Sequence, residues 1–135
     1  MKKILCLILC VSALFLLAGC GQDAPADAEI DLTKLSSTMV YSELANIVSA
    51  PDDYLGKTLK MCGTFSSFHS DQTNLTYYSC NVSDVTACCN LGLEFVLRDG
   101  YDYPEEGAEI CIVGTFSSYQ EGAQTYFTLL DAALV

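Results

Sequence analysis

Alternating apolar and polar residues from about residue 55 onwards predict five β-strands. The first predicted strand lies within residues 55–68, where Leu59, Met61 and Phe65 share one face and polar residues share the other. Further strands with the same two-residue period are predicted at residues 75–82, 91–98, 108–116 and 125–130. Because a helical pattern precedes them, the sequence predicts a mainly β fold with one short α-helix in front.

The first and fourth predicted strands repeat the same five residues. Residues 63–67 and 114–118 both read Gly-Thr-Phe-Ser-Ser, and each stretch follows an apolar run and precedes an aromatic residue. A glycine inside a strand usually marks a bulge or a sharp bend. Two bent strands of the same design, far apart in the chain, predict a small curled barrel of five strands.

The predicted helix covers residues 42–49. Leu44 and Ile47 recur there at helical spacing, and Ser42 is the predicted N-cap. Pro51 marks the end of the helix, because the residue before a proline is disfavoured in the helical conformation.

The part of the chain before the helix has a different composition. Residues 1–19 have a basic start, an apolar core and a small-residue end, which is typical of a secretory signal. Residues 20–37 are small, acidic and aperiodic, which predicts a flexible tether. We therefore place one folded domain at residues 38–135.

The end of the signal segment carries a recognisable motif. Residues 17–20 read Leu-Ala-Gly-Cys and resemble the lipobox of bacterial lipoproteins. The resemblance implies that Cys20 receives acyl chains, palmitate among them, and that residues 1–19 are removed. Two or more chains would anchor the protein stably to the extracytoplasmic face of the cell membrane. The alternative is a plain cleaved signal peptide.

The chain is strongly acidic, with a formal net charge of −11. Loss of residues 1–19 would remove two lysines and leave four basic residues against seventeen acidic ones, a net charge of −13. Nucleic-acid binding depends on clusters of Lys and Arg, so we expect no nucleic-acid partner. An anionic membrane surface is repelled as well, so the lipid must provide the anchor. The acidic surface either is only solvated or attracts cations and basic partners.

Two segments resemble known bacterial proteins. Residues 54–57 (Tyr-Leu-Gly-Lys), followed by a strand broken at Gly63, are similar to oligonucleotide/oligosaccharide-binding (OB) domains of exported proteins and lipoproteins, a group related to anticodon-binding-like OB domains. The segment with the Cys-Cys pair at residues 88–89 resembles part of small lipoproteins and permease-associated membrane proteins of Gram-positive bacteria, which carry such a pair at the matching edge of an OB-like domain. These resemblances imply an OB-like five-stranded barrel that acts as a binding or interaction module.

OB domains bind ligands on their second and third strands and the adjoining loops. Aromatic side chains in those regions could therefore form a binding face, although packing in the core and at its rim explains most of them. The candidate tyrosines are Tyr77, Tyr78, Tyr101, Tyr103, Tyr119 and Tyr126.

Five cysteines remain after Cys20, in two groups. Cys62 and Cys111 lie on the first and fourth predicted strands, which are neighbours in an OB barrel, so they form either a disulfide or a pair of buried thiols. The other group is Cys80, Cys88 and Cys89, which a chain reversal near Asp84 would bring together.

For this second group we expect one disulfide between Cys80 and either Cys88 or Cys89. Buried free thiols are one alternative. The other is a zinc or copper site made of the three thiolates with His69 or Asp84 as a fourth ligand.

No set of residues suggests an enzyme. His69 is the only histidine, and no Ser-His or Cys-His pairing, glycine-rich phosphate loop or dinucleotide fingerprint is present. The sequence therefore predicts a membrane-anchored lipoprotein that binds a protein or small molecule. The alternative is a metal-handling or thiol-redox protein that uses Cys80, Cys88 and Cys89.

Overall fold

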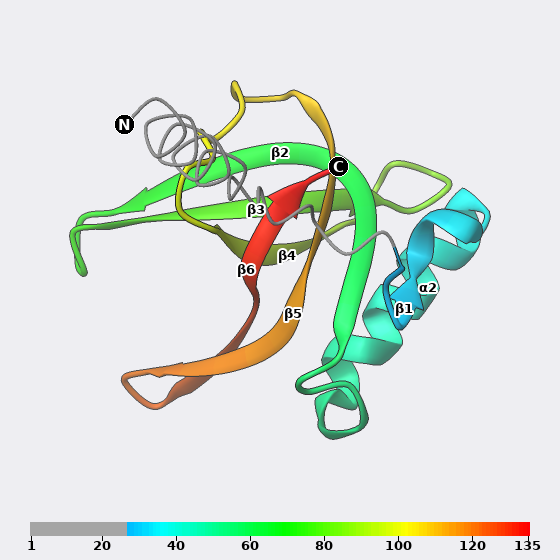
Figure 1. Ribbon diagram of the computed structural model, residues 1–135, viewed down its shortest axis with the longest axis horizontal. Coiled ribbons are helices and arrows are strands. Elements are labelled where there is room, and N and C mark those ends of the chain that lie inside the picture. The colour runs from blue at the N-terminus through cyan, green and yellow to red at the C-terminus, as the bar shows by residue number, and fades with distance from the viewer. Residues whose placement is uncertain (1–26) are drawn as a thin grey trace, which may run out of the picture.

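The computed structural model describes residues 27–135 (Figure 1). The predicted signal segment and Cys20 lie outside the described residues. None of the helices within residues 27–135 has both the length and the apolar character needed to cross a bilayer. The elements are β1 Ile30–Asp31, a 3₁₀ turn at Leu32–Lys34, α2 Ser37–Ser49, a 3₁₀ turn at Pro51–Asp53, β2 Thr58–Ser70, β3 Leu75–Ser83, β4 Asn90–Leu97, β5 Glu109–Glu121 and β6 Gln124–Leu134.

Five of the strands form a closed ring. The order around the ring is β2, β3, β4, β6 and β5, and β5 pairs with β2 to close it. The pairing of β4 with β6 is parallel, and the other four pairings of the ring are antiparallel. The short strand β1 adds to the free edge of β2 in parallel. The predicted mainly β fold, with five strands behind one short helix, is confirmed.

The core lies on the inner face of the ring. Leu59, Met61 and Phe65 of β2 are buried, as their alternation predicts. Leu44 and Ile47 of α2, which lies beside β1 and β2, are fully buried in the same cluster (Figure 1). The helix thus packs its apolar stripe against the ring.

Both repeated glycines lie where a neighbouring strand comes very close. A Cβ atom at Gly63 would overlap the backbone carbonyl of Asn81 on β3 and lie 3.0 Å from Cys80 Sγ. A Cβ atom at Gly114 would lie 3.0 Å from Leu129 Cβ on β6, and the pairing of β5 with β6 shifts register at this point. Glycine is needed at both positions because there is no room for a side chain.

The helix begins earlier than the sequence pattern indicated. Its N-cap is Ser36, and Ser42 lies inside the helix, where its hydroxyl donates to the Thr38 carbonyl over 3.2 Å. The predicted N-cap at Ser42 is therefore wrong. The reason is that Val40 packs against the core one turn before Leu44, so the apolar stripe extends towards the N-terminus.

Part of the segment predicted as a tether is folded. Ile30 pairs with Leu59 of β2, and Leu32 is only 1% exposed. The Asp31 carboxylate accepts a hydrogen bond from the Thr33 amide over 3.1 Å and so caps the short turn that follows. These two isolated apolar residues have no periodicity, which is why the prediction placed the domain boundary too late. The folded part of the chain begins by Ile30.

Cys62 and Cys111 join the two strands that close the ring. They lie directly opposite each other in the β2–β5 ladder, with their Cα atoms 4.0 Å apart, and form a disulfide. Of the two states left open by the sequence, the disulfide is the one found. It fixes the ladder on which ring closure depends.

We predict that replacing both Cys62 and Cys111 by alanine lowers the free energy of unfolding. The disulfide joins residues 49 positions apart. The chain-entropy relation gives about 4 kcal/mol for a loop of that length. Urea unfolding of the two proteins in oxidising buffer measures the difference. Reduction of the wild type should produce a similar loss, and equal stability of variant and wild type would show that the disulfide adds nothing.

Candidate functional site

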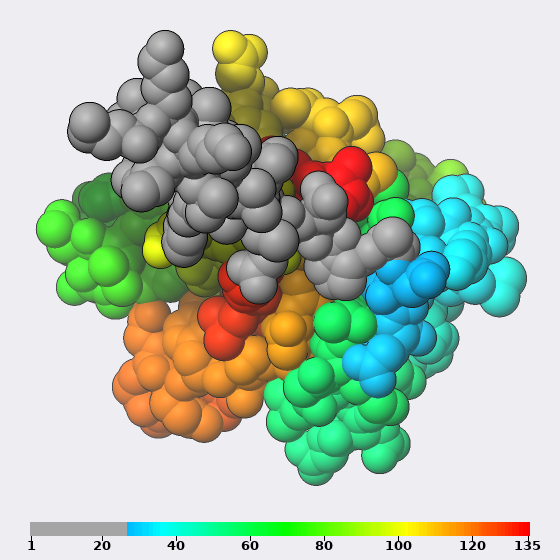
Figure 2. All heavy atoms as spheres, in the orientation of Figure 1, coloured from blue at the N-terminus to red at the C-terminus, as the bar shows by residue number. Residues whose placement is uncertain are grey.

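A groove opens between two long hairpins. The β2–β3 hairpin and the β5–β6 hairpin extend on the same side of the molecule and diverge towards their tips (Figure 1). In the space-filling view the two tips form separate lobes next to each other (Figure 2). The groove has a volume of about 670 Å³ and is lined by both hairpins and by β4, which contributes Gly92 and Glu94. This volume falls within the range of small-molecule sites.

Two tyrosine–glutamate hydrogen bonds connect the walls of the groove. The Tyr77 hydroxyl on β3 donates to Glu121 Oε2 on β5 over 2.6 Å. The Tyr119 hydroxyl on β5 donates to Glu94 Oε2 on β4 over 2.7 Å. Both bonds join strands that are not neighbours in the ring, so they hold the groove walls in register. Each carboxylate keeps its second oxygen as an acceptor.

The two hydroxyls keep their protons at ordinary pH. The hydrogen bond to Glu121 is the largest cause that raises the pKa of Tyr77, and burial adds to it. For Tyr119, burial comes first, and the hydrogen bond to Glu94 and the negative charge of that carboxylate raise its pKa further. Both phenols therefore act as permanent donors to carboxylates.

The charged groups of the groove are mainly acidic. Asp71, Glu94 and Glu121 line it, and none of the lining residues is Lys or Arg. The one basic side chain among the lining residues is His69, whose Nδ1 lies 3.1 Å from the Thr76 hydroxyl. Three carboxylates without a fixed counter-ion make the groove a region of negative potential.

Aromatic surfaces line the groove beside these carboxylates. The rings of Tyr119 and Tyr126 are stacked with centroids 5.5 Å apart, and Phe68 is 67% exposed. The six candidate tyrosines thus divide into two sets. Tyr77, Tyr119 and Tyr126 line the groove. Tyr78 and Tyr103 instead stack on each other beside Phe65 and Phe95, and Tyr101 lies near Arg98.

Two residues that line the groove, Ser79 and Gly92, contact a polar network around Asn81. A Cβ atom at Gly92 would overlap the side-chain oxygen of Asn81. The Asn81 amide donates to the Ser66 hydroxyl over 2.7 Å, and Ser66 and Ser79 share a further hydrogen bond of 2.9 Å. Glycine at position 92 therefore gives Asn81 the space that this network needs. The sequence did not point to Asn81, Glu94 or Glu121, because their partners lie on other strands.

Cys80 does not meet Cys88 or Cys89, so the expected disulfide among them is wrong. Cys80 is fully buried and pairs with Leu93, three ladder positions inside the end of the β3–β4 hairpin. That ladder ends at Ser83 and Asn90, so Cys88 and Cys89 lie in the loop beyond it. All three thiols are free.

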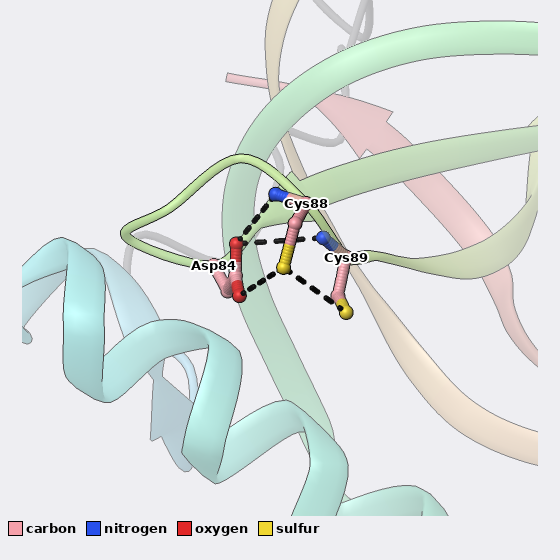
Figure 3. A group of neighbouring side chains, drawn as sticks. All are labelled: Asp84, Cys88 and Cys89. Atoms are coloured by element: carbon pink, nitrogen blue, oxygen red, sulfur yellow. Dashed lines mark hydrogen bonds between the residues drawn. The ribbon is translucent and has the colours of Figure 1, made fainter.

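Cys88 and Cys89 instead gather around Asp84 (Figure 3). The two Sγ atoms are 3.6 Å apart, and Cys88 Sγ lies 3.4 Å from Asp84 Oδ2. The other carboxylate oxygen, Oδ1, accepts the backbone amides of Cys88 and Cys89 over 3.0 and 3.4 Å. Of the two candidate fourth ligands, only Asp84 belongs to the cluster, since His69 lines the groove.

Hydrogen bonds set the proton affinities in this loop. Burial alone would raise the pKa of Asp84, but hydrogen bonds from Thr86, from the Cys88 thiol and from two backbone amides outweigh it, and the pKa lies below its usual range. The hydrogen bond with Cys88 raises the pKa of Cys89, and burial and the Asp84 charge act in the same direction. Asp84 is therefore a carboxylate at neutral pH, with two thiols beside it.

We predict that Cys88 and Cys89 react with iodoacetamide long before Cys80 does. The thiolate is the reactive form, and burial, with a smaller contribution from the Glu109 charge, raises the pKa of Cys80 to about 12. At pH 8 that thiol is almost entirely protonated, and its exposed fraction is 0%. Peptide mapping by mass spectrometry follows each site. Alkylation of Cys80 in the folded protein at the rate of Cys88 would contradict the buried position.

In comparisons with protein-family models, curated proteins and solved structures, no significant match to this chain is found. The resemblance to OB-like lipoproteins stays a prediction from motifs. The groove and the cysteine loop are therefore the features from which function can be argued.

Proposed function

We propose that this protein is an extracytoplasmic lipoprotein that acts as a binding module, with the groove between its two hairpins as the ligand site. The observation that carries the proposal is the combination of three carboxylates with exposed aromatic rings in one groove of about 670 Å³. A concave site with a few oriented polar groups is the usual form of a ligand site. Charge and aromatic surface in one groove suit binding, so we propose binding without catalysis.

The chemistry of the groove favours an organic cation, such as an ammonium or guanidinium group. Glu94 and Glu121 offer negative charge, and the tyrosine hydroxyls that donate to them fix their orientation. Tyr119 and Tyr126 stack on each other, so each ring keeps one outer face for a cation–π contact, which is worth about 0.5–2 kcal/mol. With no lysine or arginine among the lining residues, an incoming cation meets no fixed positive charge of that kind. The same balance argues against nucleic acid.

The proposed location rests on the lipobox at residues 17–20, which lies outside the described residues. An anionic membrane surface repels an acidic domain and cannot hold it by electrostatic attraction. We therefore propose that a lipid on Cys20 is the anchor. The position outside the cytoplasm is consistent with the Cys62–Cys111 disulfide, because disulfides persist in oxidising compartments.

We predict that the groove binds choline and rejects its neutral isostere 3,3-dimethylbutan-1-ol. The two molecules have nearly the same shape, so the difference measures the charge. A carboxylate and a cation about 4 Å apart attract each other by about 1 kcal/mol in bulk water and about 4 kcal/mol near a protein surface. Glu94→Gln and Glu121→Gln should therefore each weaken choline binding by roughly fivefold or more. Calorimetric and NMR titrations measure the affinities.

Glu105→Gln is the matched control for these variants. It removes the same charge from an exposed loop that does not line the groove, so choline affinity should stay unchanged. Equal binding of choline and the neutral alcohol would sink the proposed preference for cations. An equal loss in the Glu105 variant would mean that net charge, and not the groove, attracts the ligand.

We predict that Cys20→Ala moves the protein out of the membrane fraction or leaves it as an uncleaved precursor. Cys10→Ala, which alters a cysteine inside the predicted signal, should leave the protein in the membrane fraction. Fractionation followed by N-terminal analysis measures both outcomes. A wild-type protein that is found in the soluble fraction and begins at another residue would refute the lipid anchor.

A further inference from the structure

We propose that the loop between β3 and β4 is a zinc site, with Cys88, Cys89 and Asp84 as its three protein ligands. The side-chain ligand atoms of these residues all lie within 4.8 Å of one another (Figure 3). Two thiolates and one carboxylate are a donor set that zinc accepts. The site is separate from the groove and does not depend on the function proposed for it.

The spacing of the sulfur atoms fits one tetrahedral ion. Zinc lies about 2.3 Å from a thiolate sulfur, so tetrahedral angles require two sulfurs roughly 3.8 Å apart. The observed Cys88–Cys89 separation is 3.6 Å. For a sulfur and a carboxylate oxygen the same geometry requires roughly 3.6 Å, and Cys88 Sγ lies 3.4 Å from Asp84 Oδ2. Two of the ligand–ligand distances, Cys88–Cys89 and Cys88–Asp84, are thus already close to those of a tetrahedral zinc site.

The same distances favour zinc over copper. A linear site with two thiolates at this bond length would hold the sulfurs roughly 4.6 Å apart, well beyond the 3.6 Å found here. A carboxylate also suits zinc better than the soft Cu(I) ion. The sulfur spacing thus argues against a linear copper site, and of the two metals considered from the sequence we propose zinc.

The irregular backbone of the loop is what lets adjacent cysteines share an ion. In a strand, neighbouring side chains point to opposite faces. Here the β3–β4 ladder ends at Ser83 and Asn90, and the Asp84 carboxylate holds the amides of both cysteines on one side. Cys88 and Cys89 are exposed, so an ion can reach them directly from solvent.

Three protein ligands leave one tetrahedral position for water or for a donor from another molecule. Structural zinc sites are usually closed by four protein ligands, so this arrangement differs from a structural site by its one open position. The sequence suggested a metal-handling role for Cys80, Cys88 and Cys89. In the site that we propose, only Cys88 and Cys89 bind the metal, together with Asp84. Cys80 takes no part, because it is buried beneath the hairpin.

The test is a titration of the purified protein with Co²⁺, which reports thiolate ligands through charge-transfer absorption. We expect one Co²⁺ per chain, displaced by Zn²⁺, and slower alkylation of Cys88 and Cys89 once zinc is bound. Cys88→Ser and Cys89→Ser should each lose the charge-transfer signal of one thiolate. Asp84→Asn keeps an oxygen that can accept the two loop amides but removes the charged ligand. Its affinity should fall at least as much as loss of an outer-shell partner costs, roughly 10- to 100-fold.

Cys80→Ala is the matched control, because it removes the third free thiol and leaves the loop intact. Its Co²⁺ spectrum and stoichiometry should equal those of the wild type. The proposal is overturned if the wild type shows no thiolate-to-cobalt absorption, if Cys80→Ala abolishes it, or if mapping finds Cys88 and Cys89 joined to each other as a disulfide. Protection of both thiols by zinc in the wild type supports the site even if a loop variant fails to fold.

Discussion

The ladder between β2 and β5 is the constraint on which the rest of the structure depends. It pairs Thr58–Thr64 with Glu109–Thr115, closes the ring and carries the Cys62–Cys111 disulfide. Each strand carries a glycine one residue before its end of the ladder and then continues into its own hairpin with β3 or β6. Because the two hairpins leave the ladder in different directions, a groove remains between them. The ligand site that we propose is thus a consequence of how the ring closes.

The sequence predicted those features that burial alone controls. Alternation along β2 and β4 identified Leu59, Leu93 and Phe95 as core residues, since one face of each strand must avoid water. The same reasoning failed for Leu32, because one buried side chain beside a two-residue strand leaves no period to detect. The groove carboxylates were missed for another reason. Glu121 meets Tyr77 from 44 residues away, and only the order of strands in the ring brings them together.

The point at which the β3–β4 ladder ends decides whether the three free cysteines can form a disulfide. The sequence predicted a disulfide between Cys80 and one of two adjacent cysteines, Cys88 or Cys89. In the structure the ladder stops before either of them, so neither meets Cys80. The loop backbone is then organised by Asp84, whose carboxylate accepts two amides and lies beside the Cys88 thiol. A carboxylate that accepts the loop amides, and that we propose as a metal ligand, could not be recognised before the end of the ladder was known.

Electrostatics links the composition of the chain to the groove. Carboxylates that gather in one place repel each other, so such a cluster costs free energy unless something offsets it. Surface cations could do this, but none of the four lysine and arginine residues within residues 27–135 lines the groove. Tyrosine hydroxyls supply part of the compensation through short hydrogen bonds to Glu94 and Glu121. A neutral donor relieves a carboxylate without cancelling its charge. The negative potential therefore remains in the groove, available to a cation that brings the missing charge.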